Sequence, residues 1–298
     1  RALGIAQDRL EEKRLFQRLG MGTPAFATVD SRDDLDRAIA SVGASAILKT
    51  RRLGYDGKGQ FRLRAANEAD AAWLALGGVP LILEAFVPFE REVSVIAVRG
   101  RQGEFATYPL TQNWHQNSIL SASLAPAPES SKVESDARAF AQRVAEELDY
   151  VGVFAMELFV HEGRLLANEM APRVHNSGHW TIEGALTSQF ENHVRAVAGL
   201  PLGSTVGRDT SVMLNWIGEL PDANALLRES LGHWHDYGKT SRPGRKVGHA
   251  TVNGPADEVR ETLERLSQAL NRPAQFEPVV AALRPAPQPG RPTHHNRG

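Results

Sequence analysis

Two acidic residues interrupt otherwise apolar stretches in the second half of the chain. Glu157 stands within Phe-Ala-Met-Glu-Leu-Phe-Val, and Glu169 follows Asn168 within Leu-Ala-Asn-Glu-Met-Ala. A buried carboxylate is costly unless it is paired or bound to a metal. Two carboxylates and an amide are oxygen ligands of the kind that Mg²⁺ takes together with substrate phosphates. The pattern therefore predicts a magnesium site; alternatively, both acids lie on the solvent face of an edge hairpin.

The two stretches are typical of one hairpin, with strands at 154–160 and 164–170 around His161-Glu-Gly163. Residues that face each other across an antiparallel pair share a face of the sheet. Glu157 and Glu169 therefore meet directly only if the connecting loop has an odd number of residues. Because Gly163 favours a three-residue or bulged loop, we predict that the two carboxylates converge.

A glycine-rich segment, Gly54-Tyr-Asp-Gly-Lys-Gly-Gln60, comes shortly after an apolar run that ends in Lys49. Glycine permits positive φ and close approach of the backbone, and successive N–H groups can then cradle a phosphate. Lys49 and Lys58 add positive charge. The segment is not a Walker A motif, because no Gly-Lys-Ser/Thr is present and a strand follows rather than a helix. The alternative is an ordinary hairpin turn.

A polar string, Arg173-Val-His-Asn-Ser-Gly-His-Trp180, directly follows the second strand of the predicted hairpin. Arg173 offers a bidentate fork for a carboxylate or phosphate. His175, Asn176 and His179 can orient a substrate or move a proton. The alternative is a well-bonded loop that caps the next helix, but two strand carboxylates beside it favour a site.

A basic segment lies near the C-terminal end, with four cations in eight residues: Lys239, Arg242, Arg245 and Lys246. Pro243-Gly244 would hold this loop in a turn. Such a patch on a nearly neutral protein suits a small molecule that carries a phosphate. A solvated basic loop explains the composition equally well.

Three further features are ambiguous by themselves. Glu84-Ala-Phe-Val87 ends an apolar strand, and its backbone can meet an adenine edge. Glu92 can reach a ribose hydroxyl, and His115 stands in Asn-Trp-His-Gln. The spacing alone does not require any of these roles.

Apolar periodicity and capping residues predict the elements that must position these side chains. The expected helices are 8–19, a helix capped by Ser31, a helix from Asn67 to Leu76, 134–148, a helix capped by Thr181 over 182–198, and 257–270. Besides the hairpin, the expected strands are 46–49, 60–64, 80–87, 92–98, 104–110, 211–217, 233–237 and 247–252. Because strands and helices mix without a regular βαβ rhythm, we predict an α+β fold.

Composition narrows the possible functions. The chain has 298 residues, 42% of them hydrophobic and 23% charged, and its formal net charge is -1. Because the chain has no excess of positive charge, nucleic acid is not expected as a partner. Cys is absent, which excludes disulfides, thiolate nucleophiles and cysteine metal clusters. No apolar run reaches the length of a membrane span, so we expect a cytoplasmic protein without a membrane partner.

Taken in order, these segments resemble the N5-carboxyaminoimidazole ribonucleotide synthetase family, ATP-grasp enzymes of bacterial and fungal purine synthesis. The likeness runs from about Arg1 to the region of Leu283, and the string ending at Trp180 is its most specific part. The matching strings are Asp8-Arg-Leu followed by Lys13, Gly54 to Gln60, Tyr108-Pro-Leu-Thr, Asn168 to Trp180, and Arg242-Pro-Gly-Arg-Lys-Val-Gly-His249.

The resemblance implies an ATP-grasp fold, in which two α+β subdomains grip ATP, followed by a small β-rich domain. It also implies that ATP drives bicarbonate onto the exocyclic amine of 5-aminoimidazole ribonucleotide through carboxyphosphate. The products would be ADP, phosphate and the N5-carboxylated nucleotide. Mg²⁺ and a cationic cage would stabilise the transferred phosphoryl group, and the glycine-rich loop would close over it to exclude water.

The family's functional residues map onto this sequence as follows. Those implied to contact ATP are Arg9, Lys49, Gly54, Tyr55, Asp56, Gly57, Lys58, Gly59, Gln60, Glu84, Ala85, Phe86, Val87, Glu92, His115, Asn168 and Glu169. Those implied to line the bicarbonate and imidazole region are Tyr55, Asp56, Lys58, Arg173, His175 and Asn176. Glu157 and Glu169 would hold Mg²⁺, and Lys239, Arg242, Arg245 and Lys246 are candidates for the ribonucleotide phosphate. Asp56 and His175 both remain candidates for a general base.

The expected division is an ATP-grasp domain over 1–203 with a lid at 44–110, a C-terminal domain over 204–284 and a disordered tail over 285–298. Relatives are commonly dimers, so a homodimer is expected. The family normally begins with a small α/β domain that carries a Gly-Gln-Leu-Gly-type turn, which this chain lacks. The first residue is also Arg1 rather than Met, so we expect an N-terminal piece to be missing, an incomplete substrate site and an exposed apolar face.

Two other functions compete with this interpretation. One is a different ATP-grasp ligase, such as a formate-using ribonucleotide transformylase or a biotin-dependent carboxylase subunit, which should lack the string around His175. The other is a truncated, non-catalytic nucleotide-binding remnant.

Overall fold

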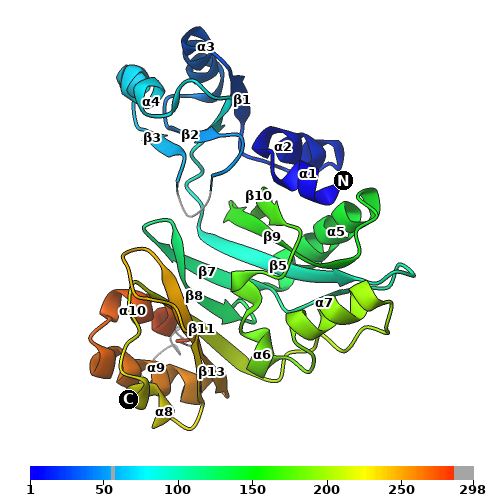
Figure 1. Ribbon diagram of the computed structural model, residues 1–298, viewed down its shortest axis with the longest axis vertical. Helices are drawn as coiled ribbons and strands as arrows, with labels where there is room; N and C mark the ends of the chain where they lie inside the picture. Colours follow the sequence, from blue (N-terminus) through cyan, green and yellow to red (C-terminus); the bar gives the residue numbers. More distant parts are fainter. Residues whose placement is uncertain (55–57, 285–298) are drawn as a thin grey trace, which may run out of the picture.

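A computed structural model of the chain describes residues 1–54 and 58–284 (Figure 1). Tyr55, Asp56 and Gly57 of the glycine-rich segment and the predicted tail over 285–298 lie outside the described residues. Within the described ranges, no helix combines the length and the apolar composition needed to cross a membrane.

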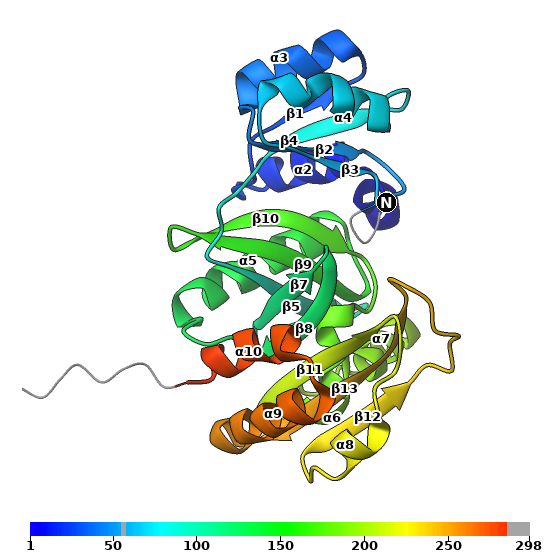
Figure 2. The ribbon, with the colours of Figure 1, turned by 90° about the vertical axis from the view of Figure 1, so that its left-hand side faces the viewer.

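The N-terminal part forms a four-stranded antiparallel sheet in the order β1-β4-β2-β3. Its strands are β1 (Phe26–Val29), β2 (Ala46–Thr50), β3 (Gln60–Leu63) and β4 (Leu81–Ala85). The helices that pack on it are α3 (Arg32–Val42) and α4 (Ala69–Leu76), the latter preceded by the 3-10 turn η1 (Ala66–Glu68). Figure 2 shows this small sheet above the rest of the molecule, with the N-terminal helices between the two parts.

A nine-stranded antiparallel sheet forms the centre of the molecule, in the order β10-β9-β5-β7-β8-β11-β13-β12, with β6 paired to β5. The strands are β5 (Arg91–Arg99), β6 (Phe105–Thr107), β7 (Thr111–Gln116), β8 (Ile119–Ala125), β9 (Gly152–His161), β10 (Arg164–Ala171), β11 (Thr210–Ile217), β12 (Gly232–Asp236) and β13 (Lys246–Gly254). The strands of the C-terminal region therefore continue the sheet of the middle region, because β11 pairs with β8.

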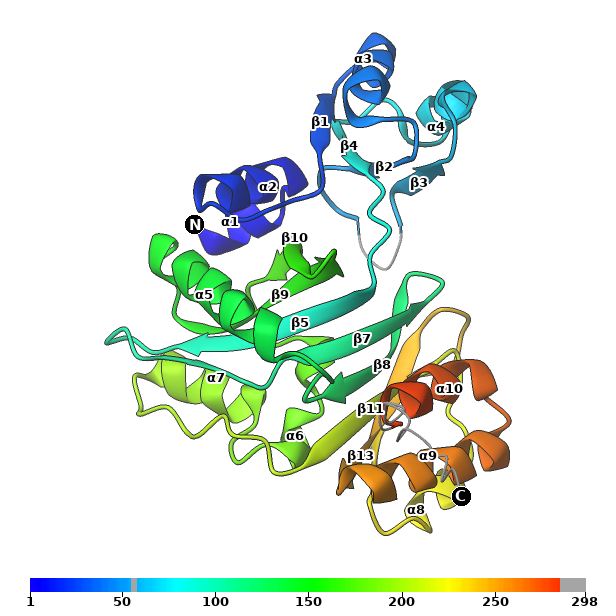
Figure 3. The ribbon, with the colours of Figure 1, turned by 180° about the vertical axis from the view of Figure 1, so that it is seen from behind.

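Helices cover both faces of the large sheet (Figure 3). They are α1 (Ala2–Ala6), α2 (Arg9–Arg18), α5 (Ser131–Glu147), α6 (Thr181–Gly184), α7 (Gln189–Ala198), α8 (Ala223–Leu227), α9 (Ala256–Leu270) and α10 (Pro273–Ala282), with a 3-10 turn η2 (Asn176–Gly178). α5, α9 and α10 pack on one face through the clusters around Val93 and Val212, and α6 and α7 pack on the other face around Ile96.

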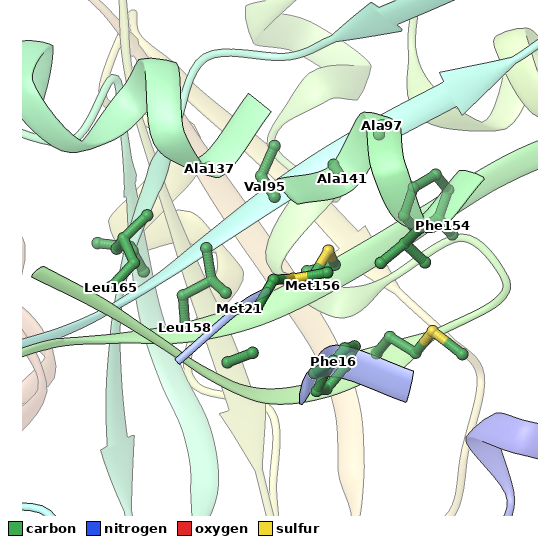
Figure 4. Close-up of a cluster of buried hydrophobic side chains, with 14 of the residues drawn as sticks. Phe16, Met21, Val95, Ala97, Ala137, Ala141, Phe154, Met156, Leu158 and Leu165 are labelled. Atoms are coloured by element: carbon green, nitrogen blue, oxygen red, sulfur yellow. The ribbon is translucent and has the colours of Figure 1, made fainter. Parts of the chain in front are cut away.

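The core between α2, α5 and the β5–β9–β10 strands supports the predicted hairpin (Figure 4). Phe16 from α2, Met156 and Leu158 from β9, and Ala141 from α5 are each at most 1% exposed. Each fully buried aliphatic or aromatic side chain contributes about 1.5–3 kcal/mol through the hydrophobic effect. This packing places α2 directly over β10.

Several predicted elements require correction. The helix predicted over 182–198 is two helices, because Ala185 is extended and pairs with Gly207, and α7 restarts at its own N-cap, Ser188. The strand predicted at 104–110 ends at Thr107, and β7 and β8 were not predicted as strands. Asn67 lies inside η1 and caps no helix, whereas Asp8 and Ser31 do cap α2 and α3 as their sequences indicate.

The expected domain boundaries stay a prediction. The small sheet is built from residues 26–85, whereas residues 91–107 of the expected lid contribute β5 and β6 to the large sheet. The mixed helix and strand content agrees with the predicted α+β class.

Candidate active site

Glu157 and Glu169 face each other across the β9–β10 hairpin. The connection is a two-residue turn, Glu162-Gly163, because Arg164 pairs with His161. The predicted odd-numbered loop is therefore wrong, since this register alone would place Asn168 opposite Glu157. A β-bulge between Ala167 and Glu169 supplies the missing residue and brings Glu169 opposite Glu157. The two carboxylates thus share one face of the sheet, as the chemistry requires.

The strand registers extend this polar face across the large sheet. Glu157 pairs with Ser94 of β5, Asn113 of β7 pairs with Ser123 of β8, and Asn215 of β11 pairs with His249 of β13. Facing residues lie on the same side of a sheet, and Glu92, which pairs with Asn113, is two residues from Ser94. The polar string after β10 and the basic segment before β13 therefore approach one face.

Buried hydroxyl and amide groups fix the polar string to this face. Asn113 Nδ2 donates to Ser94 Oγ at 3.0 Å, and Ser94 Oγ donates to Ser177 Oγ at 2.7 Å. Gln189 of α7 completes the support: its Oε1 accepts the His175 N–H at 3.0 Å, and its Nε2 donates to the His175 carbonyl at 2.6 Å. Because these groups are buried and paired, they hold the backbone of the string rigidly.

Glu157 is partnered by His175, whose Nε2 lies 3.1 Å from Glu157 Oε1. Burial raises the pKa of the Glu157 carboxyl, but the hydrogen bond from His175 and the nearby charges of His115 and Arg173 outweigh it, so the pKa lies below its usual value. Nδ1 of His175 lies 2.9 Å from Ser177 Oγ. Both imidazole nitrogens are therefore occupied, and Glu157 remains an anion.

His115 and Glu92 form a second pair on the same face, with Nδ1 of His115 2.6 Å from Glu92 Oε2. Burial lowers the pKa of the His115 imidazole, but Glu92 and the more distant carboxylates raise it further, so the pKa lies above its usual value. These two predicted residues thus come together beside the hairpin carboxylates.

Arg9 of α2 reaches the other hairpin carboxylate, with Nη1 3.0 Å from Glu169 Oε2. On the small sheet, Lys49 Nζ lies 2.9 Å from Glu84 Oε2. The side chains of Lys49 and Glu84 share one sheet face, because Glu84 pairs with Ile47, two residues before Lys49. Arg9 also acts on Glu84 through its charge. The predicted ATP-contacting residues of the two sheets therefore approach each other next to α2.

Two residues without a predicted role, Glu12 and Lys13 of α2, also join this group. Lys13 Nζ lies 3.4 Å from Glu84 Oε2, and Glu12 Oε1 accepts the Met170 N–H at 2.6 Å. Burial and repulsion by Glu169 raise the pKa of Glu12 to about 8. One feature of the sequence could have identified these two residues. They follow Arg9 at i+3 and i+4, beside the apolar stripe of α2, so they lie on the same side of the helix as Arg9.

The described ends of the glycine-rich segment lie next to Lys49. Lys49 pairs with Gln60 across β2 and β3, and Thr50 N–H donates to the Gly59 carbonyl at 2.9 Å. Gly59 has φ +68, and a Cβ there would lie 2.6 Å from Thr50 Oγ1, so this position requires glycine. Gly54 and Lys58 flank the part of the segment that lies outside the described residues.

The 84–87 segment leads from the small sheet toward the large sheet. The Ala85 and Phe86 N–H groups donate to the Ala25 and Ser45 carbonyls at 2.8 Å and 2.9 Å. Phe86 is exposed, Val87 is buried, and the guanidinium of Arg62 lies over the Phe86 ring. Glu84 Oε1 is buried without a hydrogen-bond partner among residues 1–54 and 58–284.

The basic segment meets the polar string through Lys246, whose Nζ donates to Asn176 Oδ1. Nζ of Lys239 and of Lys246 lie 5.0 Å and 5.4 Å from the centre of the Tyr237 ring. Arg242 and Arg245, in contrast, lie on a turn where Arg245 Nη1 donates to a backbone carbonyl at 3.3 Å. One of the four predicted phosphate-binding cations, Lys246, thus contacts the polar string, and Lys239 lies beside it over the same ring.

A cluster of aromatic and imidazole rings lies next to the Lys246 ammonium group. The Tyr237 hydroxyl lies 2.8 Å from Nδ1 of His249 and 3.1 Å from Nδ1 of His179. Burial, with repulsion from nearby cations, lowers the pKa of His249 to about 3 and that of His179 to about 2. Both imidazoles are therefore neutral at physiological pH. The Tyr237 hydroxyl links His179 of the polar string to His249 of β13.

Arg173 is exposed, and its Nη1 donates to the adjacent Val174 carbonyl at 3.0 Å. Its charge still acts on Glu157. Arg173 therefore lies at the rim of the polar face, where it can reach an anionic ligand.

The donor set of the hairpin fits Mg²⁺. Within residues 1–54 and 58–284, no three or more His, Cys, Asp and Glu side chains group in a way that could hold a metal. Mg²⁺ commonly takes only one or two carboxylates and completes its shell with water and substrate phosphates. A facing pair such as Glu157 and Glu169 meets that requirement, whereas Zn²⁺ would require more protein ligands.

Comparison with known proteins places this geometry in a family. A model of the ATP-grasp domain matches residues 14–190, and a model of the phosphoribosylaminoimidazole carboxylase C-terminal domain matches residues 211–263. The fold and the site together define an ATP-grasp ligase.

Several relatives and solved structures are similar to this chain. N5-carboxyaminoimidazole ribonucleotide synthase of Pseudomonas aeruginosa is 54% identical over 251 residues, 84% of this chain and 69% of the relative. The crystal structure of the synthetase from Thermus thermophilus has a TM-score of 0.86 and 55% identity, covering 91% of this chain and 74% of that chain. The synthase from Aspergillus clavatus, in complex with ADP and 5-aminoimidazole ribonucleotide, has a TM-score of 0.84 and 30% identity, covering 91% and 75%. This chain belongs to the N5-carboxyaminoimidazole ribonucleotide synthase family.

Proposed function

We propose that Glu157 and Glu169 hold the Mg²⁺ with which this chain carries out its reaction. The reaction is the ATP-dependent carboxylation of 5-aminoimidazole ribonucleotide by bicarbonate, the step of purine biosynthesis that names the family. Its products are N5-carboxyaminoimidazole ribonucleotide, ADP and phosphate. The observation that carries the proposal is the bulged register that places the two carboxylates opposite each other.

Mg²⁺ bound there would neutralise charge on the transferred phosphoryl group. Arg9 pairs with Glu169 of the large sheet, and Lys49 pairs with Glu84 of the small sheet. Their cationic heads are placed to bind the ATP phosphates, since a triphosphate competes well with a carboxylate for such groups. The buried Oε1 of Glu84, unpartnered among the described residues, can accept a hydrogen bond from the nucleotide.

The ribonucleotide would occupy the other end of the polar face. Lys239 and Lys246 supply positive charge for its phosphate, and Asn176 supplies a polar group that Lys246 already orients. His175 is held by Glu157 and Ser177 on its two nitrogens, so it is suited to orient Glu157 and the substrate rather than to take a proton. Arg242 and Arg245 would close over the phosphate from the adjacent turn.

Phosphate release tests this function. The chain is assayed with ATP, Mg²⁺ and bicarbonate, with and without 5-aminoimidazole ribonucleotide, beside Glu157→Gln and the control Glu147→Gln. Glu147 is an exposed partner of Arg1. We expect release that depends on the ribonucleotide, a loss of about 100-fold or more in Glu157→Gln, and unchanged activity in the control. Release with formate or without any acceptor would favour another ATP-grasp ligase, and no turnover in any form would favour a non-catalytic remnant.

We further propose that the protein is cytoplasmic and that it forms a homodimer. An apolar stripe on α7 supports the homodimer. Phe190, Val194 and Val197 follow one another at i, i+4 and i+7, and they are 36%, 63% and 45% exposed. Contiguous exposed apolar surface is typical of interfaces. Sedimentation velocity tests this proposal: the wild-type chain should sediment as a dimer and Val194→Asp as a monomer. A monomer in both cases would contradict it.

A further inference from the structure

Glu12 and Lys13 of α2 are almost inaccessible, with 2% and 1% exposure. Both side chains end on the backbone of β10 at the bulge. Lys13 Nζ donates to the Asn168 carbonyl at 2.6 Å and to the Ala167 carbonyl at 3.3 Å. Glu12 Oε1 accepts the Met170 N–H at 2.6 Å. Two adjacent residues of one helix thus bind the backbone on both sides of Glu169.

The bulge that they contact decides the register of the site. Without its extra residue, the two-residue turn would place Asn168 opposite Glu157. A bulge takes backbone groups out of the strand ladder, and a buried carbonyl or N–H without a partner costs about 1–3 kcal/mol. Lys13 and Glu12 supply partners for these groups. The bulged register therefore depends on two polar side chains outside the hairpin.

Packing alone does not explain polar side chains at these positions. Burying a polar group is costly unless it makes hydrogen bonds, and apolar side chains of similar volume avoid that cost. The adjacent core of Leu15 and Phe16 is apolar and fully buried, so an aliphatic pair would suit it. What an aliphatic pair would lack is the ability to bind the carbonyl of Asn168 and the N–H of Met170.

We propose that Lys13 and Glu12 are positioning residues for Glu169: they hold the bulge that turns the Glu169 carboxylate toward Glu157 and the metal. This inference rests on the proposed function, in which these two carboxylates bind Mg²⁺. Neither residue is proposed as a metal ligand, and both act on Glu169 through the backbone of β10.

Binding of Mn²⁺, a substitute for Mg²⁺ that electron paramagnetic resonance detects, measures this role without any turnover. The intact chain is titrated with Mn²⁺ in the presence of ADP, as wild type, Glu12→Ala, Glu12→Gln and Lys13→Met. Arg14→Met is the matched control, because Arg14 lies on the exposed side of the same helix and pairs with Glu11. ADP binding without metal and thermal unfolding are measured on the same samples.

We expect the Kd for Mn²⁺ to rise about tenfold or more in Glu12→Ala and Lys13→Met, which is typical when a second layer of ligand contacts is removed. Glu12→Gln should bind Mn²⁺ nearly as the wild type does, because its amide oxygen still accepts the Met170 N–H. Arg14→Met should be unchanged, and ADP binding without metal should change little in Glu12→Ala.

Three results would overturn the inference. One is wild-type Mn²⁺ affinity in Glu12→Ala and Lys13→Met while Glu157→Gln weakens it, which leaves the proposed function intact. The second is equal weakening in Glu12→Gln and Glu12→Ala, because the backbone hydrogen bond would then be irrelevant. The third is unchanged binding in Glu157→Gln, which removes the metal site and the inference with it. If Lys13→Met does not fold, the two Glu12 variants decide.

Discussion

Glu84 provides the sharpest test of the charge arrangement between the two sheets. Its carboxylate is 2% exposed and accepts the ammonium groups of Lys49 at 2.9 Å and Lys13 at 3.4 Å. Glu84→Gln keeps the shape of the side chain and removes its charge. Two buried ammonium groups then face a neutral amide, so we expect a large loss of stability in the absence of any nucleotide.

The size of that loss follows in two independent ways. Removing one partner of a buried ion pair costs about 3–5 kcal/mol. Burial raises the pKa of Glu84, but Lys13, Lys49 and Arg9 lower it further, to about 2 from an ordinary value of 4.5. At ~1.4 kcal/mol for each pH unit, that difference corresponds to roughly 3 kcal/mol. We therefore expect Glu84→Gln to lower the free energy of unfolding by about 3 kcal/mol at neutral pH.

The pH dependence distinguishes charge from shape. A carboxyl whose folded pKa is depressed stabilises the fold above its unfolded pKa and loses that contribution as the pH falls toward its folded pKa. The difference between wild type and Glu84→Gln should thus be constant above 4.5 and shrink as the pH falls toward about 2. Urea unfolding followed by circular dichroism measures it, with Glu147→Gln as the exposed control. A difference below about 1 kcal/mol at neutral pH, the value typical of surface pairs, would refute the argument.

Three further substitutions test other parts of the site. Tyr237→Phe removes the hydroxyl between two buried imidazoles, and thermal unfolding should show a loss of about 1–3 kcal/mol; an unchanged melting temperature would mean that the hydroxyl is not needed there. Gly184→Ala places a Cβ 2.0 Å from Ser211 Oγ, so calorimetry should show destabilisation of about 1–3 kcal/mol from overpacking. The pKa of Glu12 is raised to about 8, so its contribution is full below 4.5 and is lost as the pH rises through the folded pKa. Between pH 4.5 and about 8, urea unfolding of Glu12→Gln should therefore show stability that falls less than that of wild type as the pH rises.

Local signals in the sequence predicted much of the architecture. Asp8 and Ser31 cap α2 and α3, because an N-cap acts only on the next turn of its own helix. The hairpin strands and the site strings were recognisable for the same reason. The break between α6 and α7 was not, since it depends on the pairing of Ala185 with Gly207, far along the chain.

The decisive geometry of the site also lay beyond the sequence pattern. The hairpin turn is a two-residue turn, yet the carboxylates still face each other because Asn168 is extruded as a bulge. Nothing within the hairpin sequence distinguishes this bulge from a three-residue loop. Its partners, Glu12 and Lys13, come from α2, roughly 155 residues earlier in the chain. Register was therefore determined by a tertiary contact.

The charge balance around the hairpin explains why a metal should accompany the nucleotide. Arg9 is matched by Glu169, and Lys49 and Lys13 share Glu84. These cations are therefore already partly neutralised, and a triphosphate arriving between the two sheets brings more negative charge than they can offset. A divalent ion on Glu157 and Glu169, as proposed, would supply the difference and at the same time relieve the repulsion between the facing carboxylates. Binding of the metal and binding of ATP should each strengthen the other, because each removes charge that the other leaves unmatched.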